Sequence, residues 1–98
     1  MEGALEGFDW DEGNREKCQK HGVSVAEIEE ALRVIAFVVD DPYSAEKRYR
    51  TVGKTVAGRY IFAAFTIRGR KLRPISARYM HSKEVAKYEK EMAGLEKR

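Results

Sequence analysis

The residues best suited to chemistry in this chain are basic and lie in one stretch. No Asp or Glu occurs between Lys47 and Lys83, and eleven Lys and Arg residues fall within these thirty-seven positions. The stretch also contains two apolar runs, residues 60–67 and 72–77, on either side of a glycine at position 69. Aromatic and β-branched residues flanking a glycine turn predict a β-hairpin. The positive charge is therefore expected on the surface of a sheet rather than on a tail.

These residue types suffice for one reaction, the cleavage of RNA by its own 2′-hydroxyl group. A base takes the 2′-OH proton, cations stabilise the crowded phosphorane, and an acid protonates the leaving 5′-oxygen. Arg68 and Arg78 are candidates to hold the phosphate, because guanidinium groups match its oxygens in a fork and stay charged. His21 is a candidate base or acid, although a histidine at a helix end more often binds carbonyls. Tyr60 and Tyr79 are candidates to stack on bases, although such tyrosines are more often half-buried.

Metal and cofactor chemistry has little support in the composition. The chain has one cysteine, Cys18, and two histidines, His21 and His81, whereas a zinc site needs three or four ligands. We therefore expect neither a metal nor a cofactor. One cysteine also cannot form an internal disulfide, and no secretory or membrane-length apolar run is present, so we expect a cytoplasmic protein.

The net charge of +3 conceals an uneven distribution. Residues 1–46 carry a balance of −8, residues 47–83 carry +11, and residues 84–98 are neutral. This asymmetry predicts a polyanion or an acidic protein as the partner of the middle of the chain. The alternative is a solvated sheet face whose charges pair with the acidic first half.

The first third of the chain has the signals of a short strand and a helix. Residues 5–10 have the length of a strand. Asp9 with Glu12 three residues later predicts a helix start, and the helix is expected to run to His21 and end at Gly22.

A second amphipathic helix is predicted over about residues 24–35. Ser24 and Glu27 repeat the capping pattern, and apolar residues follow at helical spacing. Residues 36–39 are then expected to form a short apolar strand, stopped by Asp40-Asp41-Pro42.

Three further strands, at about residues 47–56, 60–68 and 71–79, are separated by short turns and predict an antiparallel meander. In the middle strand Ile61, Ala63, Phe65 and Ile67 should face one way, and Tyr60, Phe62, Ala64, Thr66 and Arg68 the other. A two-residue turn at Gly69 would pair Thr66 with Arg73, whereas a three-residue turn would place Ser76 and Arg78 on the Thr66 face. Pro74 cannot donate to a ladder, so it suggests an edge position or a bulge.

Ser82 is expected to cap a last helix with an apolar stripe of Val85, Tyr88, Met92 and Leu95, which would pack on the sheet or on a partner. No linker divides the chain, so residues 1–98 are expected to form one domain. The order of elements predicts an α+β fold in which a single antiparallel sheet is packed by N-terminal helices and a C-terminal helix.

Three short motifs resemble the BrnT family of toxin–antitoxin ribonucleases: Phe8-Asp9-Trp10-Asp11, Lys20-His21-Gly22-Val23-Ser24 and Arg73-Pro74-Ile75-Ser76-Ala77-Arg78. Together they cover most of residues 8–90. The resemblance implies a RelE-like fold and a metal-independent ribonuclease that cleaves messenger or single-stranded RNA and halts translation. It also implies a cognate, BrnA-like antitoxin that binds DNA, so operator DNA would be contacted only through the complex.

The matching motifs carry over five site residues, Lys20, His21, Arg73, Ser76 and Arg78. The charge argument adds Arg50, Arg59, Thr66 and Arg68. Among these, His21, Arg68, Ser76 and Arg78 are the expected catalytic residues, and the RNA-binding set is Lys20, Arg50, Arg59, Thr66, Arg73 and Tyr79.

Two other functions fit the same sequence. The basic face could bind nucleic acid or an acidic partner without cleaving it, in which case RNA affinity would come without cleavage products. The terminal helix could instead pair with another chain, which a stable dimer without salt-sensitive RNA binding would indicate.

Overall fold

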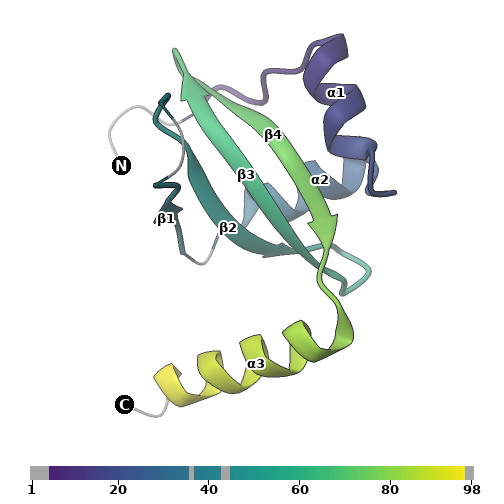
Figure 1. Ribbon diagram of the computed structural model, residues 1–98, viewed down its shortest axis with the longest axis vertical. Helices are drawn as coiled ribbons and strands as arrows, with labels where there is room; N and C mark the ends of the chain where they lie inside the picture. Colours follow the sequence, from purple (N-terminus) through teal and green to yellow (C-terminus); the bar gives the residue numbers. More distant parts are fainter. Residues whose placement is uncertain (1–4, 36, 43–44, 97–98) are drawn as a thin grey trace.

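A four-stranded antiparallel sheet in sequential strand order forms the centre of the molecule (Figure 1). The computed structural model describes residues 5–35, 37–42 and 45–96. The elements in order are α1 (Glu12–Gln19), α2 (Val25–Arg33), β1 (Val39–Asp40), β2 (Tyr49–Lys54), β3 (Tyr60–Arg68), β4 (Lys71–Tyr79) and α3 (Ser82–Glu96). The predicted α+β class with one antiparallel sheet is confirmed.

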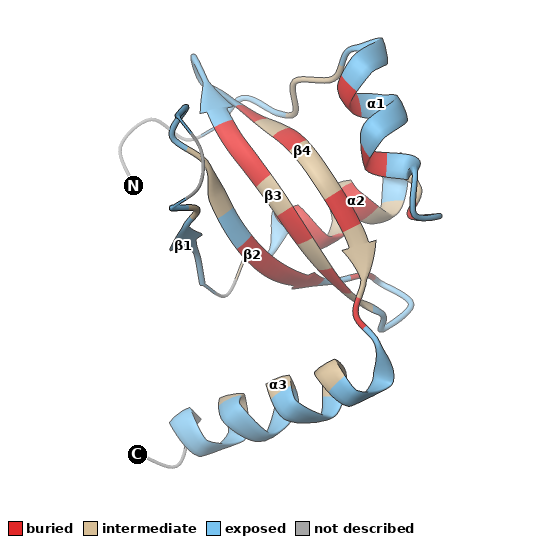
Figure 2. Ribbon diagram, in the orientation of Figure 1, coloured by how far each residue is buried: buried red, intermediate tan, exposed pale blue. Residues whose placement is uncertain are grey.

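One face of the sheet holds the core and is covered by helices. Strand alternation sends Ile61, Ala63 and Phe65 of β3 to this face, where they are buried together with Ile28 and Leu32 of α2. In Figure 1, α2 lies behind β2 and β3, and α1 runs beside β4. Figure 2 shows buried and half-buried residues alternating along β3, as the two faces predicted from the sequence require.

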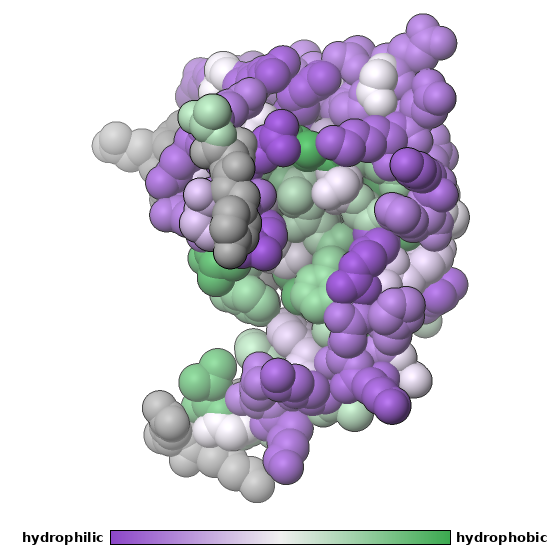
Figure 3. All heavy atoms as spheres, in the orientation of Figure 1, coloured by the Kyte–Doolittle hydropathy of each residue, from purple (hydrophilic) through white to green (hydrophobic). Residues whose placement is uncertain are grey.

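The opposite face of the sheet is open in its middle. The side chains of Phe62 and Ala64 in β3 point to this face and are half-buried. Seen from this side, hydrophobic atoms form the floor of the face and hydrophilic atoms form much of its rim (Figure 3). An apolar floor with a charged rim suits a ligand that has both flat rings and charges.

The first helix begins two residues later than predicted. Asp11, not Asp9, is the N-cap: its side chain accepts from the Asn14 amide, and the Asn14 side chain accepts from the Asp11 amide at 2.7 Å. Asp9 is engaged elsewhere, because its N–H donates to the Leu72 carbonyl at the edge of β4. The strand expected over residues 5–10 is reduced to a single parallel bridge between Phe8 and Leu72.

The second helix follows the prediction and lies very close to β2. Ser24 and Glu27 form the expected capping box. A Cβ atom on Gly53 of β2 would overlap the backbone carbonyl of Ala31 in α2. Glycine at this position is therefore what allows the helix to approach the sheet.

The turn between β3 and β4 has two residues, Gly69 and Arg70. Gly69 has a φ of +62°, which favours glycine, and Thr66 pairs with Arg73 across the hairpin. Taken alone, this turn would put Ser76 on the helix-covered face.

A β-bulge in β4 reverses that outcome. Phe65 pairs with Pro74 while Ala64 pairs with Ser76, so Ile75 is the extra residue. Ser76 and Arg78 are thereby returned to the face of Thr66. The expectation of an edge position or a bulge near Pro74 is confirmed on both counts, because β4 is the last strand of the sheet.

The first strand also differs from the prediction. The strand expected over residues 36–39 is shorter: Ala36 lies outside the described residues, and β1 contains only Val39 and Asp40. The Phe37 carbonyl accepts a hydrogen bond from the Thr51 hydroxyl, so it is not used for a longer ladder.

The last helix projects from the end of β4 and crosses the lower end of the open face (Figure 1). Ser82 is its first residue and not its cap, because the preceding His81 N–H donates to the Glu84 carboxylate. The Tyr88 ring lies 5.3 Å from Tyr60, so part of the apolar stripe does contact the sheet. Leu95, at the other end of the stripe, is 58% exposed.

Candidate nucleic-acid site

A pocket of about 420 Å³ opens on the uncovered face of the sheet. The strand register aligns Arg50, Ala64 and Ser76 in one row across β2, β3 and β4, and Phe62 with Arg78 in the next row. We call this the face pocket, and its lining residues are His21, Arg50, Thr51, Phe62, Ala63, Ala64, Ser76, Ala77 and Arg78. Four of the residues expected at the site from the sequence, His21, Arg50, Ser76 and Arg78, are thus brought together.

Arg78 is held in place from two sides. Its guanidinium lies 4.5 Å from the centroid of the Phe62 ring, and it donates to both carboxylate oxygens of Glu84 at 2.9 and 3.0 Å. The hydrogen bond from Arg78 is the main reason that the pKa of Glu84 falls to about 2. Glu84 is therefore an anion at neutral pH, and the same hydrogen bond raises the pKa of Arg78.

Arg50 lies in the face pocket and takes part in none of the ion pairs found among residues 5–35, 37–42 and 45–96. It is exposed, whereas Ser76 in the same row is half-buried. A free guanidinium beside a paired one gives the pocket a net positive charge. The pocket is accordingly suited to an anion.

His21 reaches the face pocket from the end of α1, which runs along the outer edge of β4. The start of this helix is tied to β4 by a 2.9 Å hydrogen bond from the Asn14 amide group to the Pro74 carbonyl. Gly22, with a φ of +89°, then turns the chain, and its carbonyl lies 3.4 Å from the Tyr79 hydroxyl. These contacts position the backbone on either side of His21, whose exposed side chain lines the pocket.

A second, smaller pocket of about 250 Å³ lies near the bulge in β4. We call it the bulge pocket. It is lined by four cations, Lys17, Arg48, Arg68 and Arg73, and by Glu46 as the one carboxylate, together with the backbone around Ile75. The structure thus separates Arg68 and Arg73, both expected at the active site, from the residues of the face pocket.

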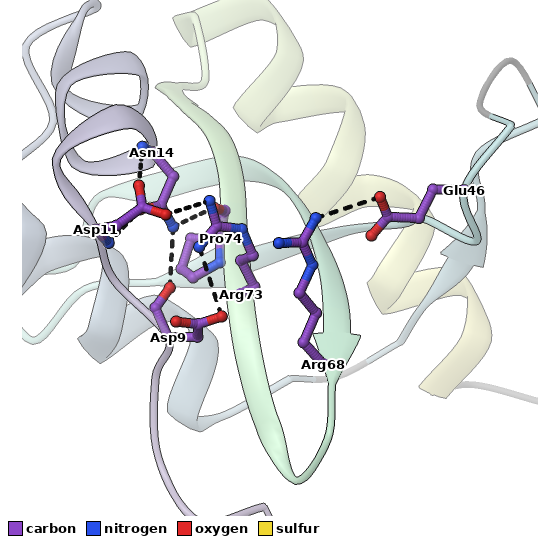
Figure 4. Close-up of polar contacts among 7 residues, drawn as sticks. All are labelled: Asp9, Asp11, Asn14, Glu46, Arg68, Arg73 and Pro74. Carbon is purple, nitrogen blue, oxygen red and sulfur yellow. Dashed lines mark hydrogen bonds and ion pairs between the residues drawn. The ribbon is translucent and has the colours of Figure 1, made fainter.

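Arg73 in the bulge pocket is already neutralised by acidic residues (Figure 4). Its guanidinium donates to Asp11 at 2.7 Å and lies 3.5 Å from Asp9, which ties the start of α1 to β4. These partners raise the pKa of Arg73, and the Asp11 hydrogen bond is the largest cause. Arg68 points instead toward Glu46, at 3.4 Å (Figure 4). The charges of the hairpin are therefore paired in part with the acidic first half, as the alternative reading of the sequence expected.

Four residues expected to bind RNA line neither pocket: Lys20, which is exposed, and Arg59, Thr66 and Tyr79, which have other contacts. Thr66 is 2% exposed, and its hydroxyl donates to the Lys47 carbonyl, so it is not available at the surface. Tyr79 faces the helix layer, where its hydroxyl donates a hydrogen bond to Glu27 at 2.6 Å. This hydrogen bond raises the pKa of Tyr79. The Arg59 guanidinium covers the Tyr79 ring at 3.4 Å from its centroid. That face of the ring is therefore closed to a base.

The remaining groups narrow the possible chemistry. Within the part of the chain that the structure describes, no cluster of three or more His, Cys, Asp or Glu side chains could hold a metal ion. Cys18 is fully buried, and burial raises the pKa of its thiol to about 11, so it is not a nucleophile at neutral pH. Among the same residues, no helix has the length and apolar character needed to cross a membrane.

Two residues of the site were not singled out from the sequence. Phe62 was placed on the correct face by alternation, but its role as the floor of the pocket depends on Arg78 lying opposite. Glu84 had no signal beyond its helix, because its contact with Arg78 depends on how the chain leaves β4.

Comparisons with known proteins identify a family and a similar structure. Residues 10–84 match the family described as "Ribonuclease toxin, BrnT, of type II toxin-antitoxin system". The crystal structure of the Brucella abortus ribonuclease toxin BrnT is similar, with a TM-score of 0.55 and 26% identity over 78% of this chain and 97% of that one. No curated protein matches the sequence significantly.

Proposed function

Because the chain belongs to the family of BrnT ribonuclease toxins of type II toxin–antitoxin systems, we propose that it cleaves RNA in the face pocket. The observation that carries this proposal is the convergence of Arg50, Ser76 and Arg78, from two strands, with His21 from the end of α1. RNA is the substrate of this family, and an antitoxin is its partner. The proposal concerns which residues of this chain perform the cleavage.

The reaction needs only groups that line the face pocket. The 2′-oxygen of one nucleotide attacks the adjacent phosphorus, the O2′–P bond forms, and the P–O5′ bond breaks. Arg50 and Arg78 stabilise the charge that builds on the phosphate oxygens, and the Ser76 hydroxyl donates to one of them. The products are a 2′,3′-cyclic phosphate and a 5′-hydroxyl. No step requires a metal ion.

His21 is proposed to move the protons of this reaction. An imidazole nitrogen can accept the 2′-OH proton and later return one to the 5′-oxygen. Glu84 is a poor base, because its pKa of about 2 leaves little driving force for proton uptake. Lys20, exposed beside His21, is proposed to contact the RNA backbone.

The test is single-turnover cleavage of a defined RNA by Arg50→Ala and Arg78→Ala, with the ends of the products mapped. Loss of one cation from such a transition state costs about 10²–10³ in rate. Arg70→Ala is the matched control, because Arg70 lies in the hairpin turn and lines neither pocket. Wild-type rates in folded Arg50→Ala and Arg78→Ala proteins would remove the face pocket as the site.

The same family membership supports a proposal for the partner and the location. We propose that the antitoxin is a DNA-binding protein of the BrnA type, that operator DNA is contacted only through the complex, and that both proteins act in the cytoplasm. A gel-shift assay on the operator tests this: the complex should shift the DNA, and the toxin alone should not. A shift by the toxin alone would contradict the proposal.

A further inference from the structure

The Arg48 side chain contains a hydrogen-bond donor that lacks an acceptor among the described residues. Its Nε atom is buried and, among the residues that the structure describes, has no hydrogen-bond partner. None of the ion pairs found among the described residues includes its guanidinium either. A buried donor without a partner costs free energy, so such groups in folded proteins call for an explanation. A ligand that brings an acceptor is one.

The bulge pocket has the charge to attract an anion to Arg48. Lys17 and Arg48 have no carboxylate partner among the described residues, whereas Arg73 is matched by Asp9 and Asp11. The pair between Arg68 and Glu46 is long, at 3.4 Å, and about half exposed on each side, so it can exchange with a ligand. The pocket therefore offers two free cations and a third that is weakly held.

The position of the bulge pocket relates it to the proposed cleavage site. Arg48 comes immediately before β2 and two residues before Arg50, so strand alternation directs both side chains to the same face of the sheet. Two residues along a strand span about 6.6 Å, close to the spacing of neighbouring phosphates in an extended RNA strand. Arg73 in the bulge pocket and Ser76 in the face pocket have the same relation along β4, with the bulge between them.

We propose that the bulge pocket binds the RNA phosphate next to the one being cleaved, with Arg48 as its main contact and Lys17 and Arg68 around it. This inference rests on the proposed function, because the face pocket defines which phosphate is cleaved. The ligand is a phosphodiester group of the RNA backbone. The subsite fixes the register of the strand, so that one phosphate lies between Arg50 and Arg78.

The test compares two non-cleavable probes, a 2′-O-methyl dinucleotide with one phosphate and a 2′-O-methyl trinucleotide with two, both titrated by NMR. Arg48→Gln should weaken binding of the trinucleotide about tenfold and leave binding of the dinucleotide unchanged. Arg50→Gln should weaken both. Arg15→Gln is the matched control, because it removes one charge from the helix that carries Lys17 but lies outside the pocket.

Each outcome has a separate meaning. An equal effect of Arg48→Gln on both probes, or no effect on either, would overturn the subsite. No effect of Arg50→Gln would instead contradict the proposed cleavage site, whatever Arg48→Gln does. Inorganic phosphate at the concentration of the trinucleotide should not displace it; displacement would assign the pocket to free phosphate and overturn the inference. Unchanged binding of both probes together with weaker antitoxin binding would assign Arg48 to the protein partner.

The midpoint of thermal unfolding separates a binding role of Arg48 from a structural one. Because the Arg48 Nε atom is buried without a partner, replacing the guanidinium should leave the midpoint unchanged or raise it. A clear fall in the midpoint of Arg48→Gln would mean that Arg48 supports the fold instead, and would also overturn the subsite.

Discussion

The salt dependence of RNA binding should be weaker than the number of basic residues suggests, and the structure gives its size. Each phosphate contact on a single strand contributes about −0.7 to the slope of log K against log salt. Only Lys17, Arg48 and Arg50 combine a place in one of the two pockets with the absence of a carboxylate partner among the described residues. With Lys20, which is proposed to contact the RNA backbone beside His21, four cations predict a slope of about −2.8.

The slope would be steeper if RNA displaced two of the protein's internal ion pairs. Arg68 and Arg78 would then join these four cations, and the slope would approach about −4.2. Arg73 is excluded from this count, because two carboxylates hold it at 15% exposure. The pair between Arg78 and Glu84 has two short hydrogen bonds, so we expect a measured slope nearer to the lower limit.

The assay is fluorescence anisotropy of a 2′-O-methyl RNA oligonucleotide at several potassium chloride concentrations. Arg50→Gln should flatten the slope by about 0.7, and Arg15→Gln, which lines neither pocket, should not change it. A flat dependence in the wild type would refute the reasoning, because it would mean that the basic face is fully compensated by the protein's own acids.

Three other perturbations have definite expected outcomes. Gly53→Ala should destabilise the protein by about 1–3 kcal/mol in urea unfolding, because the new Cβ overlaps α2, whereas Gly94→Ala, whose Cβ meets open space, should be neutral or stabilising. His21→Asn should lower the cleavage rate by about 10²–10⁴ and remove one limb of the pH–rate profile; a profile matching the wild type would leave His21 as a helix-end residue only. The folded-state pKa of Glu84, about 2, lies below its usual 4.5, so its contribution to stability is present above pH 4.5 and lost as the pH falls toward 2. Glu84→Gln should therefore lose less stability than the wild type over that range in acid unfolding, and equal losses would contradict the assignment.

The sequence predicted those features that depend on local residue pattern. The capping box of α2, the meander of β2, β3 and β4, and the two faces of β3 each depend on neighbours within a few positions. Pro74 within β4 also carried its own signal, since a residue without an N–H is tolerated only at an edge or a bulge.

The arrangement of the site could not be predicted in full, because it depends on contacts between distant residues. The turn alone would have hidden Ser76, and only the extra residue Ile75 returns it to the open face. Arg73 matches the family motif, yet carboxylates some sixty positions earlier in the chain, Asp9 and Asp11, hold it in the structure. Charge counting along the sequence has no means of separating such a paired arginine from a free one.

The start of α1 could not be predicted for the same reason. Asp9 and Asp11 are both capable of capping a helix, and the choice between them is made by the edge of β4, whose Leu72 carbonyl binds the Asp9 amide. Local capping rules cannot include that carbonyl, since it lies more than sixty residues away.

The most direct test of the central claim is a crystal structure of the protein with a non-cleavable 2′-O-methyl RNA trinucleotide. We expect one phosphate between the guanidinium groups of Arg50 and Arg78 and a base against the Phe62 ring. The 2′-oxygen of the ribose that precedes this phosphate should be directed toward His21. A phosphate bound outside the face pocket, for example near Arg59 on the helix-covered side, with the face pocket empty at saturating RNA, would contradict the account.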